Sequence, residues 1–145
     1  MTWVIDTCVL AVATPTNEQA LDAIHFLNEV LRSHCIAVDE QGEIEREYQP
    51  YMRWGSIASW WWQKMVGQAG KIWRFDGRLT QHHRQHLLGR LNFDPSDAKF
   101  IAVASRTSNR LLVSEDSDYN ADVKDYLEKE MDVAVLSLGD ALARA

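Results

Sequence analysis

The sequence predicts an α/β fold, in which a mostly parallel, five-stranded sheet lies between layers of helices. Short apolar runs of the β type alternate along the chain with segments of helical periodicity, which is typical of a parallel sheet with crossover helices. The 145 residues suit one domain, and 46% of them are hydrophobic, enough for a folded core. No repeat, low-complexity tract or linker divides residues 1–145.

The first part of the chain predicts two strands separated by a helix. Residues 3–6 form a short β-type run that ends at Asp6, and residues 35–38 form a second run before a turn-forming sequence. Thr16 precedes Gln19 by three residues, the spacing of a capping box. The helix between the two strands is therefore expected to begin at Thr16.

The middle of the chain predicts two helices and an edge strand. One helix begins near Glu43 and carries Glu47 beside its apolar face, and Gly55 separates it from a helical segment at residues 56–66. That segment contains three consecutive tryptophans. Because neighbouring helix positions point about 100° apart, at least one tryptophan is expected at the surface or an interface. The alternating residues 71–75 fit a strand at the sheet edge.

The central unit of the sequence is a helix that leads into a strand, with acidic residues at both ends. Asp94 is placed to cap this helix before a proline, Asp97 falls in its first turn, and Asn109 is expected to end it. Residues 111–113 predict a buried strand, which stops at an acidic sequence. A helix, a strand and a short helix follow at residues 121–131, 133–136 and 137–145.

Histidines gather on a predicted basic helix at residues 80–91. His82, His83 and His86 include pairs with the spacing of metal ligands. No carboxylate or cysteine accompanies them closely in the sequence, which favours a surface or phosphate-facing helix over a zinc site.

Several sequence features bear on the class of protein. No stretch approaches the ~18 apolar residues of a membrane span, and the start lacks the basic and apolar regions of a secretory signal. Two cysteines, Cys8 and Cys35, are too few for a disulfide framework, so we expect small reduced residues in a cytoplasmic protein. Glycine-rich phosphate loops and Gly-x-Ser-x-Gly sequences are absent, which disfavours P-loop nucleotidases and α/β-hydrolases.

Charge is distributed unevenly along the chain. The net charge is −6, yet residues 46–110 hold eleven basic and four acidic residues, while the segments on both sides are acidic. This basic segment contains five of the six tryptophans, in a Trp-rich stretch around residues 54–75. Basic residues interleaved with aromatic ones suit single-stranded nucleic acid. An ordinary solvated surface is the alternative.

Five acidic residues are candidates for one site. Each alone has an ordinary explanation as a turn former, a helix-dipole partner or a solvated residue. Those that follow strands or begin the central helix are expected at the same sheet edge, where ligands of open α/β sheets bind. Carboxylates gathered there would repel one another without a divalent cation, and oxygen ligands favour Mg²⁺ or Mn²⁺. The five are Asp6, Glu47, Asp97, Asp116 and Asp118.

Four pieces of the sequence together resemble the PIN-domain family of small metal-dependent ribonucleases, many of which are bacterial toxins of toxin–antitoxin pairs. They lie at residues 4–7, 37–48, 97–104 and 112–119, in the order that the family has. The resemblance implies a PIN-like three-layer sandwich over the whole chain. It also implies catalytic acids at Asp6, Glu47, Asp97 and Asp116, metal ligands at Asp6, Asp97 and Asp116, and an accessory ligand at Asp118.

Two features depart from the family pattern. Cys8 stands where the family often has Asn or Ser, so a polar contact to the site is expected to be lost. The Trp-rich stretch at residues 54–75 is longer than in the smallest toxins, which suggests an insert that clamps substrate or receives a partner.

The predicted activity is endonucleolytic hydrolysis of phosphodiester bonds in RNA. One or two Mg²⁺ or Mn²⁺ ions among the acids would activate water for in-line attack and stabilise the leaving oxygen. Arg46, Arg53 and Lys99 are candidates to hold phosphates of the substrate. The expected partners are single-stranded RNA, an antitoxin protein and a second copy of the chain.

Two other functions remain open. The same fold with a weakened site would serve as a module that binds RNA or a partner protein through its Trp-rich surface. A receiver-like phospho-acceptor domain would use Asp6 or a neighbouring acid, but it requires a lysine at a late strand end, where the sequence offers only Lys124 and Lys129 on a predicted helix.

Overall fold

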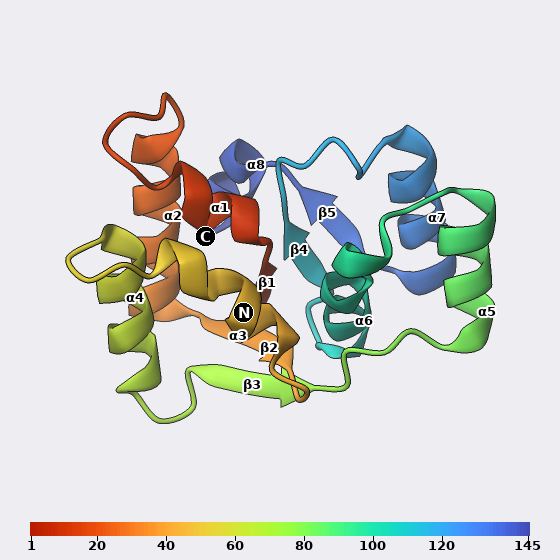
Figure 1. The fold of residues 1–145 in the computed structure, drawn as a ribbon, viewed down its shortest axis with the longest axis horizontal. Coiled ribbons are helices and arrows are strands. Elements are labelled where there is room, and N and C mark those ends of the chain that lie inside the picture. Colours follow the sequence, from red (N-terminus) through yellow and green to blue (C-terminus); the bar gives the residue numbers. More distant parts are fainter.

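A five-stranded sheet forms the centre of the computed structural model, which describes residues 1–145 (Figure 1). All neighbouring strands are parallel, in the order β3-β2-β1-β4-β5. This confirms the predicted α/β class, and the sheet is parallel throughout. The strands are β1 (Thr2–Ile5), β2 (Cys35–Asp39), β3 (Ile72–Phe75), β4 (Leu111–Val113) and β5 (Ala134–Leu136).

The strand order creates a topological switch point between β1 and β4. From β1 the chain adds β2 and β3 on one side, and it then returns to add β4 and β5 on the other. Ile5 is paired with Val113, so β1 and β4 end side by side. Open α/β sheets bind ligands in the crevice outside the carboxyl ends of such neighbours. Residues directly after Ile5 and Val113 therefore meet in that crevice.

The longer helices cover both faces of the sheet. α2 (Ala20–Ser33) packs against both α4 (Ile57–Val66) and α8 (Leu138–Arg144). α6 (Ala98–Arg106) contacts β1, β2, β3 and β4, and α7 (Ala121–Met131) packs on β5. Crossovers between parallel strands are right-handed, so a connection that moves one way along the sheet and a connection that moves the other way place their helices on opposite faces. The molecule thus has three layers, as predicted.

Short helical segments occupy the loops around the sheet. Several lie at its carboxyl edge, where they carry side chains of the candidate site. They are α1 (Thr7–Val12), α3 (Glu43–Tyr48), η1 (Gln49–Tyr51), α5 (Gln81–Arg84), the π-helical turn η2 (Gln85–Arg90) and η3 (Pro95–Asp97).

The Trp-rich stretch contributes two elements of the fold, α4 and the edge strand β3. Trp61 on α4 is completely buried, whereas its neighbour Trp60 is 49% exposed. This confirms that the three consecutive tryptophans cannot share one core. The edge position of the 71–75 run is confirmed as well.

Helix ends are where the sequence prediction was wrong. Thr16 does not begin a helix: α2 starts at Ala20, and Asn17 Oδ1 accepts the Gln19 N–H at 2.8 Å instead. Thr16 and Gln19, which have the spacing of a capping box, belong instead to a local turn that precedes the helix. Asn109 does not end α6, which stops at Arg106; its Oδ1 accepts the N–H of Thr2 at 2.7 Å.

Both cysteines are free thiols, and each is partly buried. None of the helices combines the length and the apolar character needed to cross a membrane.

Candidate metal centre

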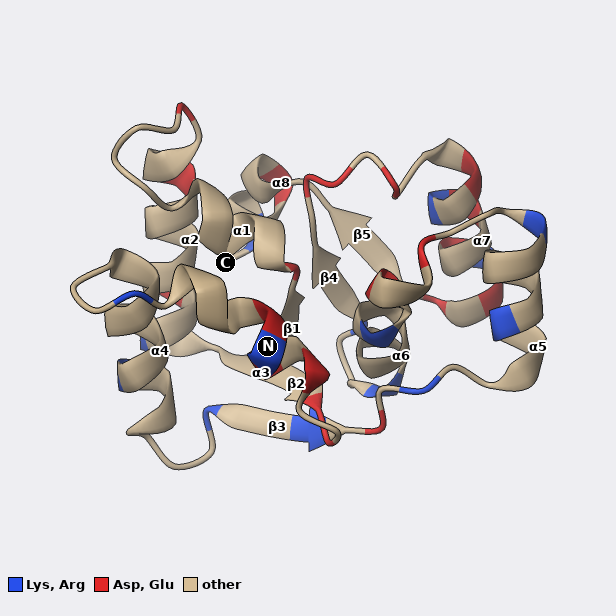
Figure 2. Cartoon of the chain, viewed as in Figure 1, with Lys and Arg blue, Asp and Glu red and all other residues tan.

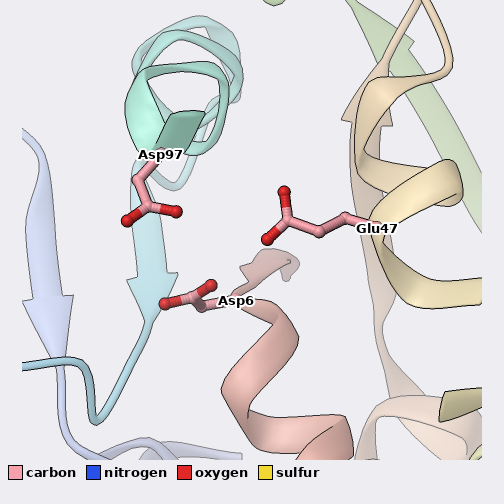
Figure 3. Close-up of side chains that lie close together, drawn as sticks. All are labelled: Asp6, Glu47 and Asp97. Atoms are coloured by element: carbon pink, nitrogen blue, oxygen red, sulfur yellow. The ribbon is translucent and has the colours of Figure 1, made fainter. Parts of the chain in front are cut away.

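Three carboxylates from distant parts of the sequence meet at the switch point. Asp6 follows β1, Glu47 lies on α3, and Asp97 stands between η3 and α6. One carboxylate oxygen from each lies within 4.8 Å of the others, and the three side chains point toward a common space (Figure 3). The structure thus brings together three of the five acids that the sequence singled out.

Asp6 is held in place by a serine from the neighbouring strand end. Asp6 is only 3% exposed, and Ser114, the first residue after β4, donates its hydroxyl to Asp6 Oδ2 at 2.5 Å. The Ser114 Oγ in turn accepts the N–H of Asp116 at 3.0 Å. This role of Ser114 was not predicted, although its position directly after a predicted strand indicated that it lies at the same sheet edge as the acids.

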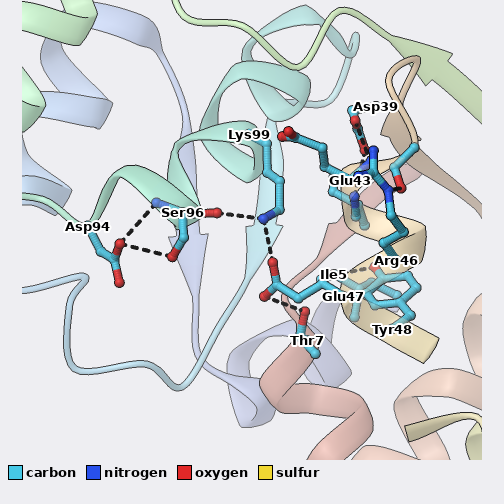
Figure 4. A network of polar contacts seen from close by, with 12 residues as sticks. Ile5, Thr7, Asp39, Glu43, Arg46, Glu47, Tyr48, Asp94, Ser96 and Lys99 are labelled. Carbon is cyan, nitrogen blue, oxygen red and sulfur yellow. Dashed lines mark hydrogen bonds and ion pairs between the residues drawn. The ribbon is translucent and has the colours of Figure 1, made fainter. Parts of the chain in front are cut away.

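Glu47 is positioned by the way α3 begins. The fully buried Asp39, at the end of β2, accepts the N–H groups of Glu43 and Ile44 at 2.9 and 2.8 Å, which fixes the first turn of α3. One turn later, Glu47 Oε1 accepts a hydrogen bond from the Thr7 hydroxyl at 3.0 Å (Figure 4). Thr7, which the sequence analysis did not single out, thus connects α1 to α3.

Lys99 has a different place from the one predicted. Its ammonium forms an ion pair with Glu47 and donates to the Ser96 carbonyl at 2.6 Å, and its side chain is only 10% exposed (Figure 4). Lys99 is therefore not a free substrate-binding cation. The first turn of α6 brings this lysine beside Glu47, so one basic residue lies among the acids.

The remaining two acids lie next to this trio. Asp116 is partly buried and lines one hollow of about 410 Å³ together with Asp6, Glu47 and Asp97. Asp118 is exposed and belongs to a second group, in which carboxylate oxygens of Asp94, Asp97 and Asp118 lie within 4.8 Å of one another. Asp97 is thus shared by two adjacent carboxylate groups.

The electrostatics of the centre reflect concentrated negative charge. Burial, together with the charges of Asp6 and Asp116, raises the pKa of Asp97 to about 7. Burial also raises the pKa of Asp6, an effect that the hydrogen bond from Ser114 opposes and the charges of Asp116 and Glu47 reinforce. The buried Tyr119 hydroxyl has no hydrogen-bond partner, and burial, with the charges of Asp6, Asp97 and Asp116, raises its pKa.

These residues fit a hard divalent cation. The donors are carboxylate oxygens, which Mg²⁺ and Mn²⁺ prefer, whereas zinc sites commonly include cysteine or histidine ligands. Burial and the nearby charges of Asp6 and Asp116 raise the pKa of Asp97, and no basic side chain pairs with Asp97, because Lys99 pairs with Glu47. A cation among Asp6, Asp97 and Asp116 would relieve that repulsion.

Cys8 keeps a contact that the sequence analysis expected to be lost. Its sulfur lies 3.7 Å from Asp6 Oδ2 and accepts the N–H of Glu115 at 3.4 Å. Burial and the charge of Asp6 raise the pKa of Cys8 to about 11, so the group is a neutral thiol at physiological pH. It acts as a weak donor toward the site.

The two arginines proposed to bind substrate differ in position. Arg46 lies on α3 and donates to the carbonyls of Gly42 and Gln41, without a carboxylate partner. Arg53 is exposed in the loop between η1 and α4 and does not line the hollow of the acids.

Comparisons of the chain with protein-family models, with curated proteins and with solved structures gave no match. Conclusions about activity therefore depend on the chemistry of the site itself.

Proposed function

We propose that the protein is a metal-dependent endoribonuclease of the PIN-like type. The observation that carries the proposal is the meeting of Asp6, Glu47 and Asp97 at the switch point, with oxygens within 4.8 Å of one another. Lys99 balances Glu47 alone, so Asp6 and Asp97 lie close together at this edge without a basic partner. A cation site would account for this arrangement.

In the proposal, Asp6, Asp97 and Asp116 hold one or two Mg²⁺ or Mn²⁺ ions, with Glu47 as a further ligand and Asp118 as an accessory one. Such an ion supplies charge stabilisation at a phosphodiester and activation of water at neutral pH. The protein's own contribution is to fix the acids in a partly water-excluded crevice: Ser114 orients Asp6, and Thr7 orients Glu47.

The surroundings of the centre favour nucleic acid as substrate. Arg46 lies on the same helix as Glu47, and further Lys and Arg residues belong to the β3–α5 connection, α5 and α6, where the ribbon of Figure 2 is blue. Phosphate contacts of this kind position a strand without reading its sequence. We also propose the partners implied by the resemblance, an antitoxin protein and a second copy of the chain.

A second function has an observation in its favour. Trp54 is 96% exposed and Trp60 is 49% exposed, and both line one surface hollow. A PIN-like module with weak or no activity would use this surface to bind RNA or a partner protein.

Cleavage separates the two functions. Purified protein is incubated with a mixed set of single-stranded and structured RNAs, and with matched DNA, in Mn²⁺, Mg²⁺ or EDTA. We expect RNA cutting with either ion and none in EDTA, and a loss of about 100-fold or more in Asp6→Asn. Asp140→Asn, an exposed site on α8, serves as the control. A well-folded wild type that cuts nothing with either ion would favour the binding module.

A further inference from the structure

A groove rich in basic side chains adjoins the metal centre. It has a volume of about 570 Å³, and its lining includes Arg46, Arg78, Arg84 and Lys99 but only one acid, Glu43. These cations come from α3, the β3–α5 connection, α5 and α6, each of which carries Lys or Arg positions coloured blue in Figure 2. We call this surface the basic groove.

The basic groove is continuous with the acids through Lys99. This lysine lines the groove and pairs with Glu47, which lines the neighbouring hollow of the acids. Arg46 stands one residue before Glu47, and its hydrogen bonds to the carbonyls of Gly42 and Gln41 hold the guanidinium at the start of α3. A chain that lies in the groove is thus led toward the metal centre.

The loop that carries Arg78 is fixed to the sheet. The Gln41 side chain donates to Asp76 Oδ1 and accepts the N–H of Gly77, both at 3.0 Å. A Cβ at Gly77 would lie 2.7 Å from the Cβ of Asp39, so only glycine permits this close approach. Asp76 pairs with Arg78 through two hydrogen bonds, from Nε to Oδ1 at 3.0 Å and from Nη2 to Oδ2 at 3.4 Å. These bonds orient the guanidinium and leave the N–H groups of Nη1 available.

Arg84 is the least engaged cation of the groove. It is exposed on α5, and neither a hydrogen bond nor an ion pair occupies its guanidinium. Even when Glu43, the Asp76 partner of Arg78 and the Glu47 partner of Lys99 are counted, the cations of the groove outnumber the acids, in a protein whose net charge is −6. An exposed excess of guanidinium groups suits bidentate contacts to phosphate.

We propose that the basic groove binds the phosphate backbone of single-stranded RNA, with Arg46, Arg78 and Arg84 contacting successive phosphates next to the metal centre. The proposal deepens the proposed function, since it gives the path by which the substrate reaches the acids. It differs from the sequence expectation by including Arg78 and Arg84 and by excluding Arg53 and Lys99.

The test measures binding without cleavage. Fluorescence anisotropy with a labelled single-stranded oligouridylate is recorded in EDTA over a series of salt concentrations, for the wild type, Arg78→Gln, Arg84→Gln and Arg90→Gln. Arg90 is the matched control, because it is exposed on the same helical segment but lines a different hollow. Competition with inorganic phosphate distinguishes a strand from a single bound anion.

We expect Arg78→Gln and Arg84→Gln each to weaken binding several-fold and to reduce the salt slope by about 0.7, the loss of one contact to a single strand. Arg90→Gln should behave as the wild type. Equal effects in all three variants, unchanged binding in Arg78→Gln and Arg84→Gln, or complete displacement by equimolar phosphate would overturn the proposal.

The outcomes also separate this proposal from the nuclease activity. If the protein binds RNA through Arg78 and Arg84 but never cleaves it, the proposed nuclease function is wrong and the groove proposal stands. If the protein cleaves RNA but its binding does not change in Arg78→Gln and Arg84→Gln, the nuclease function stands and the groove proposal is wrong.

Discussion

The ionisation of Asp97 affects the stability of the metal-free protein. Its pKa of about 7 in the folded state lies above the ordinary value of 3.8 because of burial and the neighbouring charges of Asp6 and Asp116. The folded state therefore binds more protons than the unfolded state between these two pH values. Its stability must fall as pH rises through that window.

Replacing Asp97 by asparagine should remove this loss. In EDTA at pH 8, we expect Asp97→Asn to be more stable than the wild type by about 1–2 kcal/mol, a value reduced for screening at the open hollow. At pH 4 the difference should vanish. Thermal unfolding between pH 4 and 8 measures both, with the exposed Asp122→Asn as control. Parallel curves for the wild type and Asp97→Asn would contradict the assignment.

Lys99 is the second residue with a specific consequence. Its ammonium balances Glu47, so Lys99→Met should leave the centre more negative and bind Mn²⁺ about tenfold more tightly. Isothermal titration calorimetry measures the affinity directly. Lys129→Met removes a comparable but exposed pair with Asp125 and should change nothing. Unchanged or weaker binding in Lys99→Met would mean that the lysine does not compete for the site.

Among the elements, α3 depends most on one buried side chain. Asp39 is 0% exposed and accepts two N–H groups of the first turn, so Asp39→Ala leaves both donors unpaired. We expect a loss of about 2–3 kcal/mol in the free energy of unfolding, measured by urea denaturation. Asp140→Ala, at an exposed position in the first turn of α8, should cost far less. Similar losses in both would show that the buried cap has no special role.

Sequence patterns predicted whole elements better than their ends. The extent of α7 and the position of β4 follow from periodicity, because α7 buries one face and β4 is buried throughout. The edge strand β3 was predicted from its alternating sequence, although none of its residues is fully buried. The start of α2 does not: Asn17 forms a turn that local spacing cannot distinguish from a cap. The short helix α1 was not predicted, because its six residues carry too little periodicity.

In the site, the residues at element boundaries could be predicted from the sequence, but the contacts between elements could not. Asp6, Asp97 and Asp116 could be placed at the sheet edge because each adjoins a predicted element boundary. The pairing of Lys99 with Glu47 could not be predicted, since it depends on how α3 and α6 approach each other across the crevice. Arg78 and Arg84 were not predicted for a similar reason, because the groove forms only where α3, the β3–α5 connection, α5 and α6 come together.

For the whole molecule, the strand order decides which acids meet. Periodicity identifies strands but not their neighbours, so the order β3-β2-β1-β4-β5 came from the structure. It differs from the 2-1-3-4-5 order of receiver domains, which removes the support for a phospho-acceptor. It also places β1 next to β4, and thereby Asp6 next to Ser114 and Asp116.

The exposed tryptophans predict self-association. Trp54 and Trp60 line one hollow of about 290 Å³, whereas Trp73 stands apart on the edge strand. We expect a concentration-dependent dimer by analytical ultracentrifugation that Trp54→Ser weakens and Trp73→Ser leaves intact. A monomer at every concentration, or equal effects of both substitutions, would contradict this assignment of the interface.

Cleavage by Asp97→Asn tests the central claim most directly. The rate of cutting of one RNA substrate is measured with Mn²⁺ and with EDTA, for the wild type and for Asp97→Asn. Circular dichroism checks that the variant is folded like the wild type. The account predicts metal-dependent cutting by the wild type and a rate at least about 100-fold lower in Asp97→Asn. Full activity in that variant would contradict the metal centre, because Asp97 belongs to both carboxylate groups.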